Sequence, residues 1–377
     1  MKKLTFLFLI GLIGCTNQNS KQEGKNISIF GNKHIENIQH NLVPAHYLQG
    51  RSNAKSIPQM MKENNIPAVS IVFIDHGKIS WQITFGYANL QDSIKVSPNT
   101  VFNGASLSKP VSAMAALKLV DKEILALNED VNHKLQGWKI PESHFTKKEK
   151  VSLKRLISHT AGIDNHLWSS YGNDEKVPSL IEMLTGENPS VDPPVAVVSV
   201  PGEKRKYSNP GYSIIEKLIQ DATQKEFEFA IDELIFEPCG MDNSSFEQPV
   251  PDQMKMFMAT GYTNDLNPYP YKLFPFKAAG GIWTTPTDLG KFLMALMDDY
   301  HSGKNVILSK KMADSVFQKS PERLGFSKLY DDKSNELLFE HWGSNSGFTS
   351  YMVASLKNFI HFWNSLCSVL QAIWLLR

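Results

Sequence analysis

Ser106 and Lys109 stand three residues apart in the stretch F-N-G-A-S-L-S-K-P, just ahead of the apolar run V-S-A-M-A-A-L-K-L-V. On a helix this spacing places both side chains on one face, near enough to interact. A serine hydroxyl becomes a nucleophile when a neighbour takes its proton, and a lysine whose pKa is lowered by burial can be that neighbour. The start of a helix also offers backbone N–H groups to a developing oxyanion. The alternative interpretation is a helix-capping serine beside a surface lysine.

Tyr207 and Asn209 form a second candidate pair, in the stretch P-G-E-K-R-K-Y-S-N-P-G-Y. Their spacing of two places both side chains on one side of an extended loop. We expect Asn209 to cap the helix that Pro210 opens, which would fix the loop. Y-x-N also occurs elsewhere in the chain, so it is the flanking proline and glycine residues that single out this copy.

His341 belongs to a third stretch, H-W-G-S-N-S-G-F-T-S-Y-M-V, which is typical of a strand that leads into a glycine turn. Gly343 would let the backbone of this strand approach another segment closely. Backbone N–H groups of such a strand can stabilise the oxygen of a bound acyl group. The alternative for His341 is a histidine with satisfied hydrogen bonds and no role in a site. A further histidine, His159 in S-H-T-A-G, is expected to fix a loop and not to catalyse.

The elements that would position these residues are a sheet at both ends of the chain and a helical block between them. A-V-S-I-V-F-I and K-I-S-W-Q-I-T-F-G are β-rich runs joined by D-H-G, which predicts a hairpin, and Q-M-M-K-E-N-N ahead of them predicts a short helix. The periodicity from about 111 to 240 is mainly helical. Residues 337–339 and 349–354 are predicted strands. This order indicates an α/β (α+β) protein.

Length and charge set limits on the class of protein. The chain has 377 residues and a formal net charge of +1, enough for a sizeable core and no reason to expect a nucleic-acid partner. Neither a phosphate-binding glycine loop nor an H-E-x-x-H metal helix is present. Three cysteines do not make a disulfide framework.

The N-terminal stretch reads as a secretion signal. M-K-K is followed by a short apolar run and then Cys15. Leu12 to Cys15, L-I-G-C, resembles a bacterial lipobox, which implies cleavage before Cys15 and a lipid on its thiol. We therefore expect a signal peptide at 1–14, a tether and lead-in at 15–50, and a lipoprotein of the cell envelope held at the membrane by Cys15. The alternative is a plain signal peptide.

The three stretches together resemble the serine β-lactamase-related hydrolases, which share the fold of class C β-lactamases and penicillin-binding proteins. S-L-S-K, Y-S-N and H-W-G match the Ser-x-x-Lys, Tyr-x-Asn and Lys/His-x-Gly elements of that family, in the same order. The resemblance implies a β-lactamase/transpeptidase-like fold over 51–377, with an antiparallel sheet flanked by helices. The sheet would come from about 66–110 and 275–356, and the mainly helical insert from about 111–274.

The same resemblance implies roles for single residues. Ser106 would be the acylated nucleophile, with either Lys109 or Tyr207 as its base. Asn209 would hold a substrate amide or Lys109. His341 and Gly343 would border the substrate, and the oxyanion would lie between the backbone N–H groups of Ser106 and Ser344. No metal and no cofactor is implied, the partner is a small-molecule or peptide substrate, and the oligomeric state is left open.

Two departures from the family pattern bear on the substrate and on the fold. His341 and Trp342 replace the lysine and the hydroxyl residue of Lys-Thr-Gly, which in β-lactam enzymes help to hold the substrate carboxylate. This favours an acyl-enzyme serine hydrolase for esters or amides, D-amino-acid peptides among them. The alternatives are a β-lactamase or D-alanyl-D-alanine carboxypeptidase, and an inactive binding lipoprotein of the envelope.

The second departure is the tail at 357–377. The family continues here into further strands and a closing helix, whereas this chain has N-F-I-H-F-W-N-S-L-C, as an early stop or a shifted reading frame would produce. A membrane anchor and a partly buried terminal helix are the two interpretations. Loss of central strands is expected to expose apolar surface.

Overall fold

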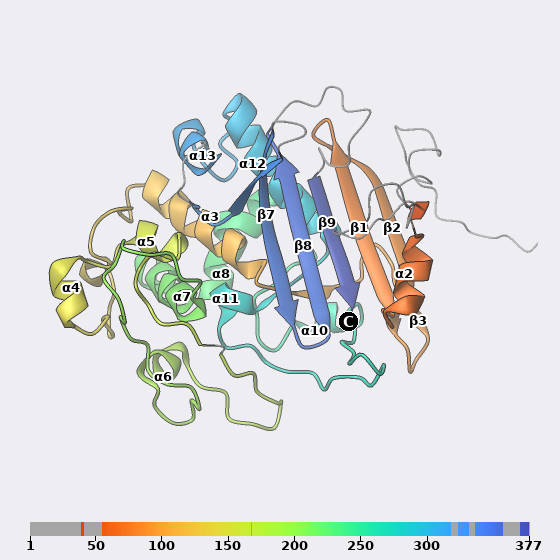
Figure 1. The fold of residues 1–377 in the computed structure, drawn as a ribbon, viewed down its shortest axis with the longest axis horizontal. Helices are drawn as coiled ribbons and strands as arrows, with labels where there is room; N and C mark the ends of the chain where they lie inside the picture. The colour runs from red at the N-terminus through yellow and green to blue at the C-terminus, as the bar shows by residue number, and fades with distance from the viewer. Residues whose placement is uncertain are drawn as a thin grey trace, which may run out of the picture.

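A seven-stranded antiparallel sheet forms one side of the molecule in the computed structural model, which describes residues 39–40, 55–166, 168–317, 323–331, 336–356 and 370–376. The strand order is β3-β2-β1-β9-β8-β7-β6 (Figure 1). Its strands are β1 Ala68–Asp75, β2 Lys78–Asn89, β3 Ile94–Lys95, β6 Ser327–Asp331, β7 Glu336–Asn345, β8 Phe348–Ser355 and β9 Leu370–Leu376. A second, two-stranded sheet pairs β4 Phe102–Ala105 with β5 Ile282–Thr284.

Helices pack against the sheet and fill the other side of the molecule (Figure 1). The longest are α3 Ser108–Asp121, α7 Asn209–Thr223 and α12 Pro286–Ser302. The shorter ones are α2 Ile57–Glu63, η1 Val131–His133, α4 His144–Lys148, α5 Leu153–Ile157, α6 Leu180–Thr185, α8 Phe227–Ile231, η2 Asp232–Phe236, α9 Glu237–Cys239, α10 Asp252–Lys255, α11 Lys277–Gly280 and α13 Lys310–Phe317. The predicted antiparallel sheet flanked by helices is confirmed.

The first hairpin follows directly from its sequence. β1 and β2 pair from Ala68 with Gly86 to Asp75 with Lys78, so His76 and Gly77 alone form the turn. Both turn residues have positive φ, 51° and 67°, the conformation that matches the twist of a two-residue hairpin. The hairpin that D-H-G predicts is therefore present.

Both faces of β1 are buried, because alternate residues belong to two different hydrophobic clusters. Val69 and Ile71 pack with Ile57 of α2 on one face. Val72 and Ile74 face the main core, on the side where α12 crosses β1, β2 and β9. This period of two makes the apolar run A-V-S-I-V-F-I a central strand with helices on either side.

α3 lies in the middle of the helical region and packs against α7, α11 and η2. Its sequence is apolar or small on every side, and such a helix is stable only when it is surrounded by protein. Eleven of its residues are buried, Ser108 and Lys109 at its start included. The amine of Lys109 therefore lies inside the core, whereas Lys118 on the same helix is only partly buried.

At Leu370–Leu376 the structure has strand β9, which contradicts the expectation of a terminal helix or a membrane anchor there. β9 lies antiparallel between β1 and β8, with Ile71 opposite Ile373 and Val353 opposite Gln371. The expectation that the sheet lacks a central strand is therefore wrong at this place. A short apolar run fits either a buried strand or a helix, and pairing with two strands selects the strand. Residues 357–369 lie outside the described residues.

Among the helices that the structure describes, none combines the length and the apolar character that crossing a membrane requires.

β7 passes the turn between β4 and α3 at very short range. A Cβ atom built on Gly343 would lie 2.4 Å from the carbonyl oxygen of Gly104 and 3.1 Å from the backbone nitrogen of Ser106. The same Cβ atom would lie 2.3 Å from Oγ of Ser350, a hydroxyl that donates to the Gly104 carbonyl at 2.9 Å. Only glycine lets the two segments come this close.

Gly343→Ala should therefore destabilise the fold. The added methyl group meets a backbone carbonyl that cannot rotate away, so β7 or the Gly104 turn must move. We expect the free energy of unfolding to fall by about 1–3 kcal/mol, the usual cost of overpacking, as measured by urea denaturation. Ser346→Ala, at an exposed position in the turn after β7, is the matched control and should change it little. Equal stability of the two variants would contradict the close packing.

Candidate active site

Ser106 and Lys109 lie together at the start of α3. Nζ of Lys109 is 3.1 Å from Oγ of Ser106 and donates to the carbonyl oxygen of Ala279 at 2.5 Å. The residue that caps α3 is Leu107, and it makes no side-chain capping bond. The interpretation as a capping serine beside a surface lysine is therefore wrong, since Lys109 is fully buried.

Burial lowers the pKa of Lys109 well below its ordinary value of 10.5. An ammonium group in this position loses its hydration and finds no carboxylate partner in the described part of the chain. The rings of Tyr207 and Tyr212 lie 4.8 and 5.7 Å from Nζ, which favours the charged form only slightly. The balance favours a neutral amine beside the Ser106 hydroxyl.

The backbone just before Ser106 is held in an unusual conformation. Ala105 has a positive φ of 47°, which is rare for a residue with a Cβ. Its N–H donates to Oδ1 of Asn103 at 3.1 Å, and the same oxygen accepts from Nδ2 of Asn345 on β7 at 2.7 Å. The turn that presents Ser106 is thus fixed by a buried amide pair between β4 and β7.

Tyr207 reaches the same place from the loop ahead of α7. It shares a hydrogen bond with Ser106, and burial raises its pKa to about 12 against the opposing effects of that bond and of the Arg205 charge. A phenol in this environment keeps its proton at neutral pH. The structure thus brings Ser106, Lys109 and Tyr207 together, as the resemblance to the family implied.

Asn209 does not cap α7, and its role in holding a substrate amide stays a prediction. Its Nδ2 donates to the carbonyl oxygen of His166 at 3.4 Å, and the described residues show no hydrogen bond between Asn209 and Lys109. The expected capping role falls to Ser208, whose Oγ accepts from the N–H of Gly211 at 3.0 Å. Ser208 has the extended backbone that an N-cap needs, whereas Asn209 already belongs to the first turn of α7.

His159 holds the loop that carries Tyr207. Nδ1 of His159 accepts from the N–H of Ser208 at 3.2 Å, and its ring lies 4.4 Å from that of Tyr207. Burial, reinforced by the charge of Arg205, lowers the pKa of His159 well below 6.5. It is therefore a neutral, buried residue that holds the loop, in agreement with the sequence analysis, and it also forms part of a cavity wall.

His341 lies on β7 with its ring buried. Its Nδ1 is 2.8 Å from the carbonyl oxygen of Trp342, so Nδ1 carries the proton and Nε2 is left as an acceptor. Burial lowers the pKa of His341 to about 3, and the charge of Arg205 acts in the same direction. Unlike the lysine that the family has here, His341 brings no positive charge.

Trp342, by contrast, is 57% exposed and stacks on Tyr351 with ring centroids 4.0 Å apart.

Ser344 follows Gly343 on β7, one residue from the contact with the Ser106 backbone. Its side chain is exposed. The backbone of β7 at this point and the N–H of Ser106 therefore border the same small region, where an oxygen atom of a substrate would be stabilised.

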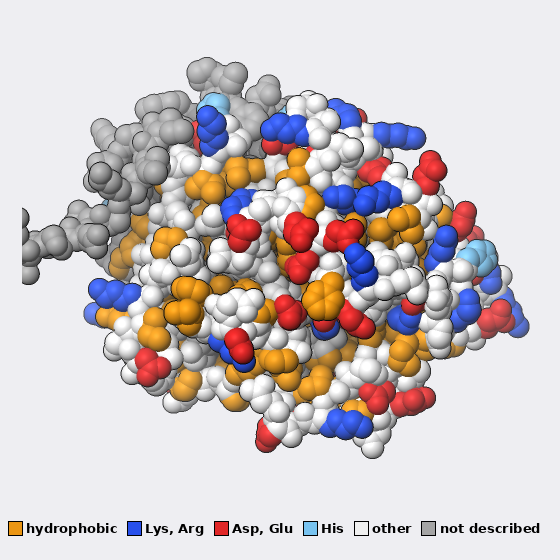
Figure 2. Space-filling view, turned by 180° about the vertical axis from the view of Figure 1, so that it is seen from behind, with side chains coloured by type: hydrophobic (Ala, Val, Ile, Leu, Met, Phe, Trp, Pro, Cys, Tyr) orange, Lys and Arg blue, Asp and Glu red, His pale blue; other side chains and the backbone are white. Residues whose placement is uncertain are grey.

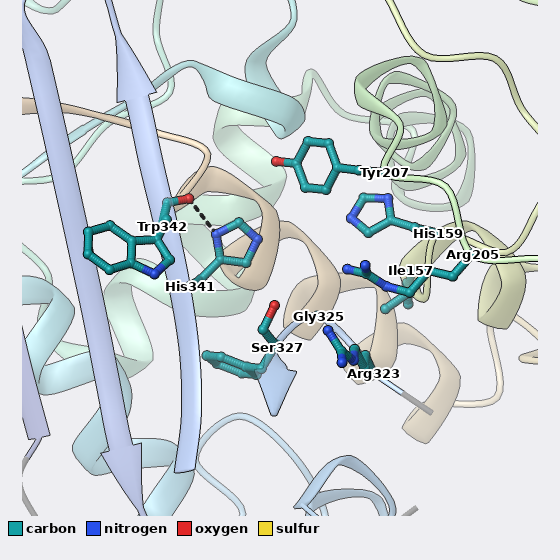
Figure 3. Close-up of a pocket in the computed structure, with 10 residues that line it drawn as sticks. Ile157, His159, Arg205, Tyr207, Arg323, Gly325, Ser327, His341 and Trp342 are labelled. Carbon is teal, nitrogen blue, oxygen red and sulfur yellow. Dashed lines mark hydrogen bonds between the residues drawn. The ribbon is translucent and has the colours of Figure 1, made fainter. Parts of the chain in front are cut away.

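A cavity of about 220 Å³ opens beside Tyr207 and His341, and we call it the catalytic cavity. Ser106 does not line it, but is hydrogen-bonded to Tyr207, which does. Figure 3 shows His341 facing Tyr207 and His159 across it, with Arg205 and Arg323 on the remaining side. Gly325, Phe326 and Ser327 complete that side. The site is thus a pocket with neutral imidazoles, a neutral phenol and two guanidinium groups.

Sequence reasoning missed the residues that support Lys109. Glu216 of α7 is buried and accepts from the N–H of Ala278 at 2.8 Å, next to the carbonyl that receives Lys109. Burial raises the pKa of Glu216 to about 8. A lone acid within the apolar stretch S-I-I-E-K-L-I was the available signal. Arg323 lies outside all three motifs, so the sequence contained no signal for its place in the site.

Among the residues that the structure describes, no three His, Cys, Asp or Glu residues come together as the ligands of a metal ion would. Cys15 lies outside these ranges, so the lipidation site stays a prediction.

Comparisons with known proteins identify relatives over most of the chain. Protein flp of Staphylococcus aureus (strain N315) is 23% identical over 311 residues, which cover 80% of this chain and 60% of that protein. The chain therefore spans only about 60% of the length of this curated relative.

Two solved structures share the fold. A penicillin-binding protein homologue from Pyrococcus abyssi, titled octameric, superposes with a TM-score of 0.69 at 24% identity, over 85% of this chain and 71% of the other. A D-amino acid amidase from Ochrobactrum anthropi SV3 gives a TM-score of 0.65 at 20% identity, over 84% and 87%. At these identities the likeness concerns the fold alone.

The model of one protein family, described as Beta-lactamase, matches residues 53–363, which include all three motifs. This chain belongs to the β-lactamase family.

Proposed function

We propose that this chain is a serine hydrolase that forms an acyl-enzyme on Ser106. The observation that carries the proposal is the amine of Lys109, fully buried, 3.1 Å from Oγ of Ser106 and with a lowered pKa. A neutral amine at this distance is a base for a serine hydroxyl.

In the acylation step, Oγ of Ser106 attacks the carbonyl carbon of an ester or amide while Nζ of Lys109 takes its proton. The backbone N–H groups of Ser106 and Ser344 stabilise the oxyanion. As the bond to the leaving group breaks, Lys109 returns this proton through Tyr207 to that group, so that both side chains regain their starting protonation. We assign the base to Lys109 and not to Tyr207, since the raised pKa of Tyr207 disfavours the phenolate.

In the second step a water molecule attacks the acyl carbon of the ester on Ser106. Its proton goes to Lys109, which passes it to Oγ of Ser106 as the bond between Oγ and the acyl carbon breaks, and the acid leaves. The hydrogen bond from Lys109 to the Ala279 carbonyl keeps Nζ in place through both steps.

Esters or amides, D-amino-acid peptides among them, are the substrates that we propose. The likeness to a D-amino acid amidase supports this class. A neutral His341 and the indole of Trp342 replace groups that hold a β-lactam carboxylate, so we expect β-lactams to be poor substrates or slow acylating inhibitors.

The proposal is tested by the intact mass of the chain after treatment with a fluorophosphonate probe. We expect one adduct in the unaltered protein and none in Ser106→Ala, because only an activated serine reacts. Ser346→Ala is the control and should be labelled like the unaltered chain. A parallel treatment with penicillin tests the substrate class, since a rapidly turned-over penicillin would favour a β-lactamase instead. A folded chain that takes up no probe would favour the inactive binding protein.

The lowered pKa of Lys109 gives a prediction that needs no substrate. Between the folded pKa and the unfolded value of 10.5, the unfolded chain holds the extra proton, so the free energy of unfolding rises with pH. Relative to Lys109→Met, we expect the unaltered chain to gain up to about 1.4 kcal/mol per pH unit on going from neutral to alkaline pH. Urea denaturation at several pH values measures this difference.

Lys62→Met, at an exposed lysine of α2, serves as the control for this experiment. Its stability should follow the same pH dependence as that of the unaltered chain. If Lys109→Met also ran parallel to the unaltered chain, Lys109 would be charged in the folded state and would not be the base.

We further propose that the protein is an envelope lipoprotein anchored through Cys15, on the strength of L-I-G-C after a short apolar run. Cys15→Ala should abolish incorporation of labelled palmitate in growing cells and release the protein from the membrane fraction. Incorporation that persists in the variant would show that Cys15 is not the lipidated residue.

A further inference from the structure

A second, larger hollow adjoins the catalytic cavity. It has a volume of about 630 Å³ and is bordered by seven cationic side chains and one carboxylate. Five of the cations come from the segment K-K-E-K-V-S-L-K-R at 147–155, which runs from α4 into α5. The other two are Arg205 and Arg323, which also line the catalytic cavity. We call this second hollow the basic groove.

Three of the lysines that border the basic groove have no carboxylate partner among the described residues. Its one carboxylate, Glu149, pairs with Arg155 at 3.0 Å. Within the described ranges, Lys147, Lys148 and Lys150 form no ion pair. Lys and Arg side chains also gather at the right-hand edge of Figure 2, the end of the molecule where α4 lies. Since the formal charge of the whole protein is only +1, this concentration is local.

Arg205 and Arg323 make the groove and the catalytic cavity continuous. Arg205 stands two residues ahead of Tyr207, and burial together with the charge of Arg323 lowers its pKa. Two guanidinium groups that repel each other, with no carboxylate from the described chain between them, are stabilised when an anion binds. An anion at this junction would lie between Ser106 and the lysines of the groove.

We propose that the substrate hydrolysed at Ser106 carries a polyanionic chain that lies in the basic groove. The inference rests on the proposed hydrolase function and adds the class of substrate, an ester or amide joined to a chain of repeated phosphate or carboxylate groups. Arg205 and Arg323 bind the charge nearest the reacting carbonyl, and Lys147, Lys148 and Lys150 bind those further along. A concave groove next to a nucleophile suits a flexible chain better than a flat membrane surface.

The test is direct binding of fluorescent polyphosphate, and separately of fluorescent polyglutamate, to the full chain carrying Ser106→Ala, followed by anisotropy. We expect binding that weakens steeply with salt, because each contact releases counterions. Replacing Lys147, Lys148 and Lys150 together by alanine should weaken binding by about tenfold or more and flatten the salt dependence. Whichever of the two chains binds more tightly identifies the charged group.

The matched control replaces three exposed lysines at the opposite end of the molecule, Lys62, Lys78 and Lys95, by alanine. This variant loses the same charge and should bind like its parent. If both triple variants weakened binding equally, the attraction would be unspecific and the proposal wrong. Competition by vesicles with anionic lipid as strong as that by polyphosphate would overturn it in favour of a membrane surface.

Fluorophosphonate labelling separates this proposal from the hydrolase proposal. With Ser106 intact, the variant lacking Lys147, Lys148 and Lys150 should react with the small neutral probe as fast as the unaltered chain. If Ser106 is labelled but binding of the polyanion does not depend on the groove lysines, the hydrolase proposal stands and the proposal of a polyanionic substrate in the basic groove is wrong. Groove-dependent binding without labelling of any variant would overturn the hydrolase, and with it the claim that the bound chain is a substrate.

Discussion

The burial of one amine is the constraint on which the rest of this site depends. Lys109 stands at the buried start of helix α3, and its side chain is fully buried. With no carboxylate partner in the described chain, its neutral form is the one that folding favours. Burying a lysine here lowers the free energy of unfolding, as is common at sites where a group must be reactive.

α11 keeps that amine in position, although it is only four residues long. Its backbone is bound by side chains from three other elements: Glu216 of α7 on the N–H of Ala278, Lys109 of α3 on the carbonyl of Ala279, and Asn345 of β7 on the carbonyl of Gly280. Because each bond comes from a different direction, displacement of any one of these elements moves the acceptor of Lys109. The sheet, the central helix and α7 are thus joined at the site itself.

How far the sequence predicts such a site depends on whether the signal is local. The hairpin of β1 and β2 was predictable, since D-H-G determines its own turn, and the three motifs were predictable because each is a short stretch with a fixed backbone. The cap of α7 was misassigned by one residue, since serine and asparagine both cap helices and stand side by side. β9 was not predictable, because an apolar run becomes a strand only where two others leave room for it. Arg323 enters the site through the tertiary fold alone.

The distribution of charge in the pocket follows from the same arrangement. Arg205 disfavours protonation of His159 and of His341, and burial acts on both in the same direction. The imidazoles therefore stay neutral, and the positive charge of the pocket resides on Arg205 and Arg323, at the side that opens to the basic groove. An anion bound by these guanidinium groups would offset the field that acts on His341 and His159, but not the desolvation that alone lowers the pKa of Lys109. In the proposed hydrolase, burial would set the pKa of the amine next to Ser106 and charge would attract the substrate, so that each could be strong without weakening the other.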